Sequence, residues 1–385
     1  MAGNFVGINI YDPWELAGLI SAKPRQSRFL SKRYGNVDEV EITEGKRVAV
    51  DYEFESTQIA PYVTDNSTGL ALGTDGYGTL EIDVPNVGVK KNLSKKELEK
   101  RLPGEDPANP FDIPTRAQKN IEKFSEKLET AIAAREELQV AEVLSTNGLK
   151  IEERDDKTGN IINSYNIDYL APLDSTTSSL NARQKALMAQ AKARAVCACS
   201  DWSTSSLVEI IQECDGVLQK YAEAGIVLTE LLISPKIWTK LQSNEKFMTP
   251  FQNAMYASQF GDLNGEDLGD PNAAVVAHLK VRGRTIKIIV FDGTYVDNDG
   301  TVKSYLPEDK AIFTAPNVIK FKYGSHVMIP EGSNEFENMT GTRIPELYVD
   351  RSNSSKEYRL HSHPLAMPKQ FASWCVMTVL PGGSD

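Results

Sequence analysis

Two histidines near the carboxyl end of the sequence are its best candidates for metal chemistry. His361 and His363 are separated by one residue in a strand-like segment, so both imidazoles are expected on one face. Such a pair binds zinc when further ligands complete the coordination shell. The chain has four histidines, and spacing alone names no third ligand. The sequence therefore favours surface or interface histidines over a metal site.

A cysteine pair is the second candidate. Cys197 and Cys199 are separated by one residue, whereas zinc ribbons and thioredoxin-like redox sites need two intervening residues. With Cys214 and Cys375 they are the only cysteines of the chain, which is too few for a disulfide framework. Reduced thiols without redox function are expected.

The acidic segment from Asp262 to Asp270 could attract calcium. It lacks the alternating ligands and the terminal glutamate of a helix-loop-helix calcium site, so a solvated acidic loop is expected. The sequence also contains no Gly-x-Ser-x-Gly elbow, no phosphate-binding loop and no dinucleotide fingerprint. We therefore predict no catalytic, cofactor-binding or metal-binding residue, and a protein that is not an enzyme.

Length and composition describe the body that carries these residues. The 385 residues exceed the size at which one core stops growing, which predicts two lobes or one lobe with long extensions. A hydrophobic fraction of 41% and a charged fraction of 25% are typical of globular proteins. The net charge of -11 argues against a broad basic surface for nucleic acid, although it permits a wall that only surrounds DNA.

The sequence gives no sign of a membrane or export segment. The first 30 residues lack the apolar run of a signal peptide, and no segment approaches the roughly 18–20 apolar residues that span a bilayer. We expect a cytosolic product with no membrane partner.

One long helix is the clearest predicted element. Pro114 suits its first turn, no Gly or Pro follows up to Thr146, and Asn147-Gly148 is a suitable stop. The apolar residues fall mostly at steps of three and four, which leaves Lys119, Glu126 and Glu129 on the solvent side. At 1.5 Å per residue the helix is about 45–50 Å long.

The other elements divide into an extended part before this helix and a compact part after it. Period-two alternation predicts a two-stranded ribbon over 37–60 that turns near Glu44-Gly45, and a strand over 79–84. A glycine-rich excursion over 61–103 is too poor in apolar residues to fold alone. After the long helix the patterns predict a hairpin over 148–174, helices over 179–199, 203–224 and 235–241, and strands over 225–234, 286–291, 310–314, 358–363 and 373–380.

Local segments and their order resemble the lambda-type head protein family of tailed bacteriophages. The most specific segment is Arg101-Leu-Pro-Gly-Glu-Asp-Pro-Ala-Asn109, just before the long helix. Further segments in the family's order are Ser234-Pro-Lys-Ile-Trp238, Phe291-Asp-Gly-Thr-Tyr-Val296, Tyr305-Leu-Pro-Glu-Asp309 and His363-Pro-Leu-Ala-Met367. The similarity implies an α+β protein with the Hong Kong 97-type capsid fold.

The resemblance implies a division into five parts. These are an N-terminal arm (1–45), an extended β loop (46–112), a peripheral domain with the spine helix (113–202), an axial domain (203–330) and a return to the peripheral domain (331–385). It implies a major capsid protein that forms hexamers and pentamers in an icosahedral shell around double-stranded DNA, without sequence-specific DNA binding. Scaffold, portal and decoration proteins are implied partners, and the implied location is the virion after assembly in the host cytoplasm.

Two alternatives remain open at this stage. A cellular nanocompartment shell, of the encapsulin type, has the same fold but holds enzyme cargo instead of DNA. A metal-dependent cytosolic enzyme using His361 and His363 is the other alternative. If the capsid interpretation is right, deletion of 46–103 should leave a soluble, folded subunit that cannot close shells.

Overall fold

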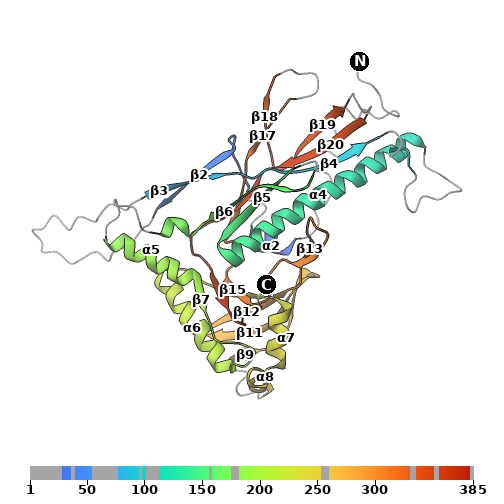
Figure 1. Ribbon diagram of the computed structural model, residues 1–385. Helices are drawn as coiled ribbons and strands as arrows, with labels where there is room; N and C mark the ends of the chain where they lie inside the picture. Colours follow the sequence, from blue (N-terminus) through green and yellow to red (C-terminus); the bar gives the residue numbers. More distant parts are fainter. Residues whose placement is uncertain are drawn as a thin grey trace, which may run out of the picture.

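The computed structural model describes residues 28–35, 40–53, 77–94, 98–100, 112–155, 158–174, 182–252, 260–329, 335–350 and 355–381. These residues form a mixed α+β structure with an upper part along one long helix and a lower part around an eight-stranded sheet (Figure 1). One core lies on one face of the eight-stranded sheet, and a second core joins the other face of that sheet to the second half of the long helix.

The long helix α4 (Ile113–Thr146) confirms the predicted spine within a residue at each end. Pro114 lies in its first turn, where the missing N–H costs nothing. Asn147 ends the helix in the left-handed conformation, with φ of 55°, and its N–H donates to the carbonyl of Val143. The helix is therefore delimited by the local signals that the sequence shows.

A three-stranded antiparallel sheet lies along the first half of α4, in the order β19 (Ile344–Asp350), β20 (Ser355–Ser362) and β4 (Val87–Leu93). Its inner face buries Leu347, Tyr358 and Leu360 against helix residues that include Ile121 and Ile132. Because side chains alternate along a strand, the residues between them in β19 and β20 project from the opposite face.

The second half of α4 packs on a second three-stranded sheet, in the order β1 (Val40–Ile42), β16 (Ile319–Tyr323) and β21 (Pro364–Pro368). The indole of Trp374 donates to the carbonyl of Leu144 at 3.0 Å, and the hydroxyl of Tyr169 donates to the carbonyl of Ala366 at 2.7 Å. These hydrogen bonds satisfy the polar atoms of buried aromatic residues in the junction between the two parts.

The predicted ribbon over 37–60 is wrong in its pairing. β1 pairs in parallel with β16, while β2 (Arg47–Glu53) pairs with β3 (Tyr77–Asp83), which confirms the strand over 79–84. Alternation gave the strands correctly but does not identify their partners. Of the excursion over 61–103, only 77–94 and 98–100 belong to the described residues. The rest of it and the Arg101–Asn109 segment lie outside them.

The eight-stranded sheet of the lower part is built almost entirely from the second half of the chain. Its order is β10-β11-β12-β8-β15-β22-β7, with β9 paired to β11. The strands are β7 (Val196–Ala198), β8 (Glu230–Ile233), β9 (Gly261–Asp262), β10 (Glu266–Asp270), β11 (Ala273–Val281), β12 (Arg284–Phe291), β15 (Lys310–Thr314) and β22 (Cys375–Thr378). Helices α5 (Ala182–Ala195), α6 (Leu207–Glu223), α7 (Pro235–Ser243) and α8 (Glu245–Gln252) complete it.

Helix starts in the lower part follow local chemistry. Ser206 and Glu209 form a reciprocal capping box at the start of α6, and Ser234 caps α7 ahead of Pro235. These starts confirm the helices predicted over 203–224 and 235–241. None of the helices in the described residues is both long and apolar enough to cross a membrane.

Two sequence expectations need correction in this sheet. The predicted helix over 179–199 ends at Ala195, and Val196–Ala198 is a strand. The last strand of the chain, β22, was expected to return to the part of the molecule that contains the long helix. It instead lies between β15 and β7 in the eight-stranded sheet, where Cys375 and Met377 are buried.

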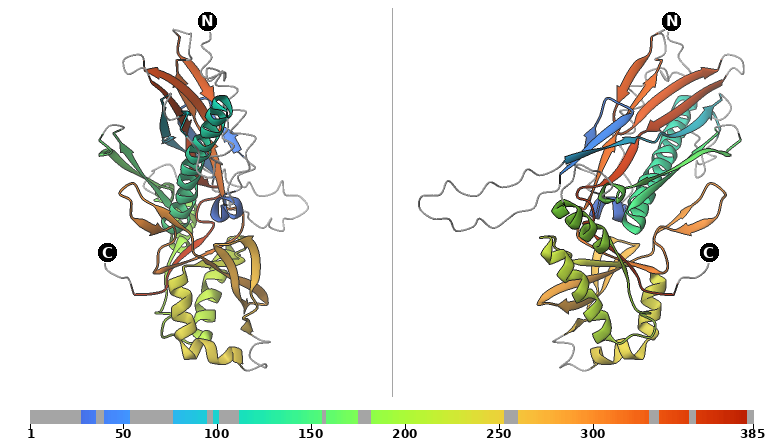
Figure 2. Two further views of the ribbon diagram at one scale, coloured as in Figure 1. Left: turned by 90° about the vertical axis from the view of Figure 1, so that its right-hand side faces the viewer. Right: turned by 60° about the vertical axis from the view of Figure 1, so that its left-hand side comes forward.

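Four two-stranded ribbons project from this body (Figure 2). They are β2-β3, β5 (Gly148–Arg154) with β6 (Ile161–Asp168), β13 (Thr294–Val296) with β14 (Val302–Ser304), and β17 (Ser325–Met328) with β18 (Glu337–Thr340). The β5-β6 pair confirms the predicted hairpin over 148–174.

Candidate assembly surface

A short helix, α2 (Phe29–Arg33), is anchored on the spine by a buried carboxylate. Glu137 accepts hydrogen bonds from the backbone N–H groups of Leu30 at 2.8 Å and Ser31 at 2.9 Å. Burial raises the pKa of Glu137, although the hydrogen bonds from Ser31 and Leu30 act in the opposite direction. The carboxylate supplies acceptors that the first turn of a helix otherwise lacks.

A second buried carboxylate, Glu136, joins three segments of the chain. It accepts from Arg28 at 2.7 Å, from Arg343 at 2.6 Å and from the hydroxyl of Tyr323 at 2.7 Å. Burial alone would raise the pKa of Glu136, but the two arginines outweigh burial and hold it below its usual value. Arg343 also pairs with Glu129 at 2.6 Å, so Glu129 is not on the solvent side as expected.

The same short helix is tied to the lower part through Glu230 of β8. Arg33 donates to Glu230 from Nε at 2.8 Å and from Nη2, and the hydroxyl of Tyr34 donates at 3.0 Å. Phe29 stacks on Phe291 of β12 with ring centroids 5.5 Å apart. Residues 28–34 therefore fix the orientation of the two parts with respect to each other.

The projecting ribbons expose apolar side chains that a single subunit does not cover. Ile162 of β6 is 73% exposed, Val296 and Val302 of the β13-β14 ribbon are 69% and 68% exposed, and Phe336 beside β18 is 77% exposed. A two-stranded ribbon is marginally stable by itself and presents unpaired backbone groups at its edges. Apolar residues at such edges are typical of surfaces that another protein covers.

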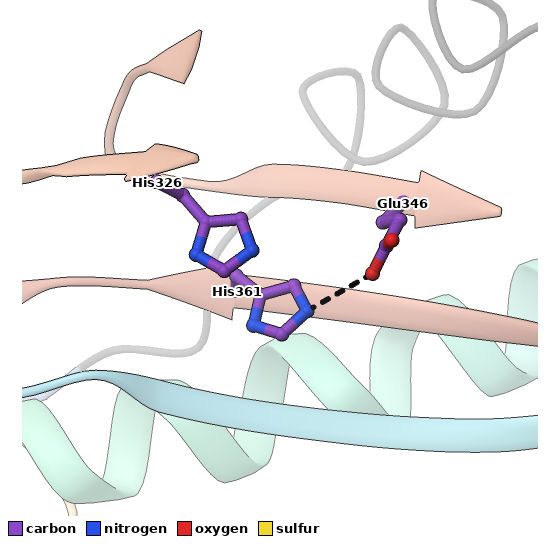
Figure 3. Close-up of side chains that lie close together, drawn as sticks. All are labelled: His326, Glu346 and His361. Atoms are coloured by element: carbon purple, nitrogen blue, oxygen red, sulfur yellow. Dashed lines mark ion pairs between the residues drawn. The ribbon is translucent and has the colours of Figure 1, made fainter. Parts of the chain in front are cut away.

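The two histidines singled out in the sequence lie close to a third, His326 of β17. The imidazole of His361 in β20 stacks on that of His326 with centroids 4.1 Å apart, and Nε2 of His363 lies 3.1 Å from Nδ1 of His326. Figure 3 shows His326 and His361 with Glu346 of β19 on the sheet face opposite α4. Sequence spacing missed His326 and Glu346 because strand pairing and packing, not a local motif, bring them there.

The four cysteines lie together in the lower part of the molecule without forming a disulfide. Cys197 is in β7, Cys199 follows it, and Cys214 and Cys375 are buried in the same apolar core; all four are free thiols. Burial raises the pKa of Cys214 to about 12, and burial also raises the pKa of Cys199 and Cys375. Protonated, buried thiols are poor nucleophiles, and their arrangement suggests packing as their role.

The acidic residues around β9 and β10 already pair with other groups of the same chain. Asp262 lies 3.0 Å from Nδ1 of His278, and Glu266 pairs with Lys287 at 2.5 Å. Asp267 accepts from the N–H of Gly269 two residues on, a local turn contact. In the part of the chain that the structure describes, three metal-type ligand atoms come within 4.8 Å of one another at one group, His326, Glu346 and His361.

Comparison with known proteins places this architecture among viral shell proteins. The sequence matches the family of phage major capsid protein E over residues 13–379. A crystal structure assigned as the capsid protein of an Escherichia coli CFT073 prophage is similar, with a TM-score of 0.60, 15% identity, and coverage of 96% of this chain and 99% of that one. No curated protein matches the chain at a significant level.

Two more distant structures are a phage capsid and an encapsulin shell. The cyanophage P-SCSP1u capsid has a TM-score of 0.45 at 10% identity, covering 94% of this chain and 90% of that one. The SrpI encapsulin of Synechococcus elongatus PCC 7942 has a TM-score of 0.40 at 9% identity, covering 95% of each chain. Likenesses this weak do not distinguish a phage capsid from a nanocompartment.

The fold and the family match together define a tailed-phage capsid subunit with the Hong Kong 97-type fold. The chain belongs to the phage major capsid protein E family. It is a structural protein of the virion capsid and not an enzyme, which sets aside the metal-dependent enzyme that the histidine pair left open.

Proposed function

We propose that the projecting ribbons are the contacts through which this capsid protein forms hexamers and pentamers and closes an icosahedral shell around double-stranded DNA. The observation that supports this most directly is the exposure of Ile162, Val296, Val302 and Phe336, which no other part of the described subunit covers. Burying these side chains against a neighbour gains about 25 cal/mol per Å² of apolar surface.

The five-part division gives each region a role in this proposal. The arm (1–45) and extended loop (46–112) contact a neighbouring subunit in addition to packing on their own subunit through α2, β1 and β4. Residues 113–202 with 331–385 and the axial part, 203–330, form the rest of the tile. The junction at Glu136, Glu137 and Glu230 keeps the tile rigid. A rigid tile supports closed shells, because rings close only when every copy presents its contacts at the same angle.

The DNA inside such a shell would be contained without sequence-specific binding. A net charge of -11 supports containment, because phosphate recognition depends mainly on lysine and arginine. Assembly on a scaffold protein in the host cytoplasm, attachment to a portal and clamping by a decoration protein complete the proposal. Nucleic acid in purified particles tests it against the nanocompartment alternative, which predicts enzyme cargo and no packaged genome.

A paired substitution on the β5-β6 ribbon tests the assembly contacts. Ile161→Asp with Ile162→Asp should leave subunit unfolding unchanged, because both residues are exposed, but should prevent shell formation in electron micrographs. Ile161→Val with Ile162→Val is the matched control and should assemble. Normal shells from the aspartate variant would contradict a role for this ribbon.

The extended loop needs a more careful deletion than the sequence suggested. Removing 46–103 would take β4 from the sheet on α4 and the buried Val48, Ile82 and Leu93 from two cores, so the subunit would not stay folded. Replacing 54–76 by an Asn-Gly turn joins Glu53 to Tyr77, which are already paired. This variant should fold, remain soluble and fail to close shells; particles of normal size would contradict the loop's role.

A further inference from the structure

We propose that His326, His361 and Glu346 form a binding site for one divalent transition-metal ion of the zinc class, which fastens the β17-β18 ribbon to the sheet that lies along the spine helix (Figure 3). His363 lies beside His326, so three of the chain's four histidines gather at this one place. The ligands come from three different strands, β17, β19 and β20.

The spacing of the ligand atoms suits a metal ion. Two ligands at about 2.1 Å from a tetrahedral zinc ion are about 3.4 Å apart. Nε2 of His361 and Oε2 of Glu346 are 3.3 Å apart, and all three ligand atoms lie within 4.8 Å of one another. Because the His326 and His361 rings are nearly parallel, at 15°, binding requires one imidazole to turn so that its lone pair converges on the ion.

Unsatisfied polar atoms at the cluster point to a missing ligand. Both ring nitrogens of His361 and Nδ1 of His363 are buried and have no hydrogen-bond partner. A neutral imidazole has one acceptor nitrogen, and leaving it buried without a partner costs free energy. A metal ion would satisfy the acceptor of His361, and the contact between His326 and His363 would orient the second imidazole.

The chemical types of the ligands also suit a cation. Glu346 places a carboxylate oxygen 3.3 Å from Nε2 of His361, so an ion between these atoms would have an acidic ligand beside an imidazole. Two imidazoles and one carboxylate are the ligand set of many zinc sites.

The cationic neighbours do not block the site. Arg359 approaches Oε2 of Glu346 at 3.4 Å, but it also pairs with Glu357 at 2.7 Å and lies over the ring of Tyr348. Arg359 therefore keeps other partners when Glu346 turns to an ion. Gly88 lies opposite His361 in β4, where a Cβ would be 3.0 Å from Nδ1, so glycine leaves room for the ring.

The ion would hold a ribbon that has few other contacts to the body. At its base, Ser325 and Asn338 each donate to the carbonyl of Glu44 at 2.7 Å, and the N–H of Gly324 donates to His363. Fixing His326 to the β19-β20 pair adds a restraint on the direction in which the ribbon leaves the sheet. That role rests on the proposed assembly contacts, whereas metal binding by the subunit does not.

Titration calorimetry of the unassembled full-length subunit with zinc chloride tests the site. We expect one ion per chain, and at least about tenfold weaker binding in each of His326→Asn, His361→Asn and Glu346→Gln. His278→Asn is the matched control, because His278 is the one histidine outside the cluster, and it should bind as the unchanged chain does. Equal loss in the control, or unchanged binding in the cluster variants, would overturn the proposal.

A second measurement removes the dependence on variants that fold poorly. Cobalt(II) added to the unchanged subunit should give the intense visible absorption bands of a tetrahedral site, and one equivalent of zinc should abolish them. Absence of stoichiometric binding by both ions would refute the site. Because neither measurement requires shells, a failure of metal binding is distinct from a failure of the ribbons to assemble.

Discussion

The junction beside the second half of α4 buries charged residues, whereas the projecting ribbons expose apolar residues, and both are the reverse of the usual pattern in a folded protein. At the junction, Glu136 and Glu137 are 1% and 3% exposed, whereas on the ribbons Ile162 and Phe336 are 73% and 77% exposed. Charges are buried where the orientation of segments must be fixed, since paired groups accept only a few geometries. Apolar residues are exposed on the ribbons, where we propose that a neighbouring subunit binds.

The largest expected effect tests the junction. Glu136→Ala leaves Arg28 and Arg343 without their shared buried carboxylate, which should lower the free energy of unfolding by about 3–5 kcal/mol. The urea midpoint of the unassembled subunit measures it. Arg47→Ala is the control, because its pairs with Glu81 and Asp83 are exposed, and its midpoint should not move. Equal shifts in the two variants would contradict the importance assigned to burial.

Acid should weaken the same junction. The folded-state pKa of Glu136 lies below its usual 4.5, so its stabilisation is complete above about pH 4.5 and is lost as pH falls through the lower folded value. Urea midpoints between pH 3 and 6 should therefore fall more steeply in the unchanged chain than in Glu136→Gln. Identical slopes would mean that other carboxylates account for the acid sensitivity.

Loss of a helix cap outside both regions should have an intermediate effect on the free energy of unfolding. Ser206→Ala removes the capping box at the start of α6 and should cost about 1 kcal/mol, measured by the urea midpoint. Ser203→Ala, in the turn just before the helix, is the matched control and should have a smaller effect. A cost as large as that of Glu136→Ala would show that the junction is not exceptional.

The smallest effect on folding should come from the ribbons. Val296→Ser with Val302→Ser should leave the urea midpoint unchanged, because both side chains are exposed, while reducing the yield of shells in sedimentation profiles. A clear loss of subunit stability would mean that the β13-β14 ribbon packs on its own subunit. The comparison between junction and ribbons would then fail.

Much of the fold could be predicted from local signals. Pro114 and Asn147 delimit the spine, and Ser206, Glu209 and Ser234 start two helices, because capping depends on residues within one helical turn. Strands such as β12 and β15 were also recognisable from their apolar runs. The pairing of β1 with β16 was not, since alternation specifies a strand without specifying its partner.

The candidate metal site shows where sequence reasoning stopped. His361 and His363 were identifiable as a pair, but His326 and Glu346 belong to other strands and only folding brings them near. Glu129 was placed on the solvent side by helical periodicity, yet it pairs with Arg343 from a distant segment. Periodicity describes one helix and does not include what packs against it.

The sequence by itself determined the spine helix, the caps and the buried strands, because those depend on hydrogen bonds and periodicities within a few residues. Only the tertiary structure decided that β22 joins the eight-stranded sheet, that Glu136 and Glu137 are buried and paired, and that three histidines gather beside Glu346. Those outcomes depend on contacts between residues far apart in the chain. Such contacts form only when folding has brought the distant segments together.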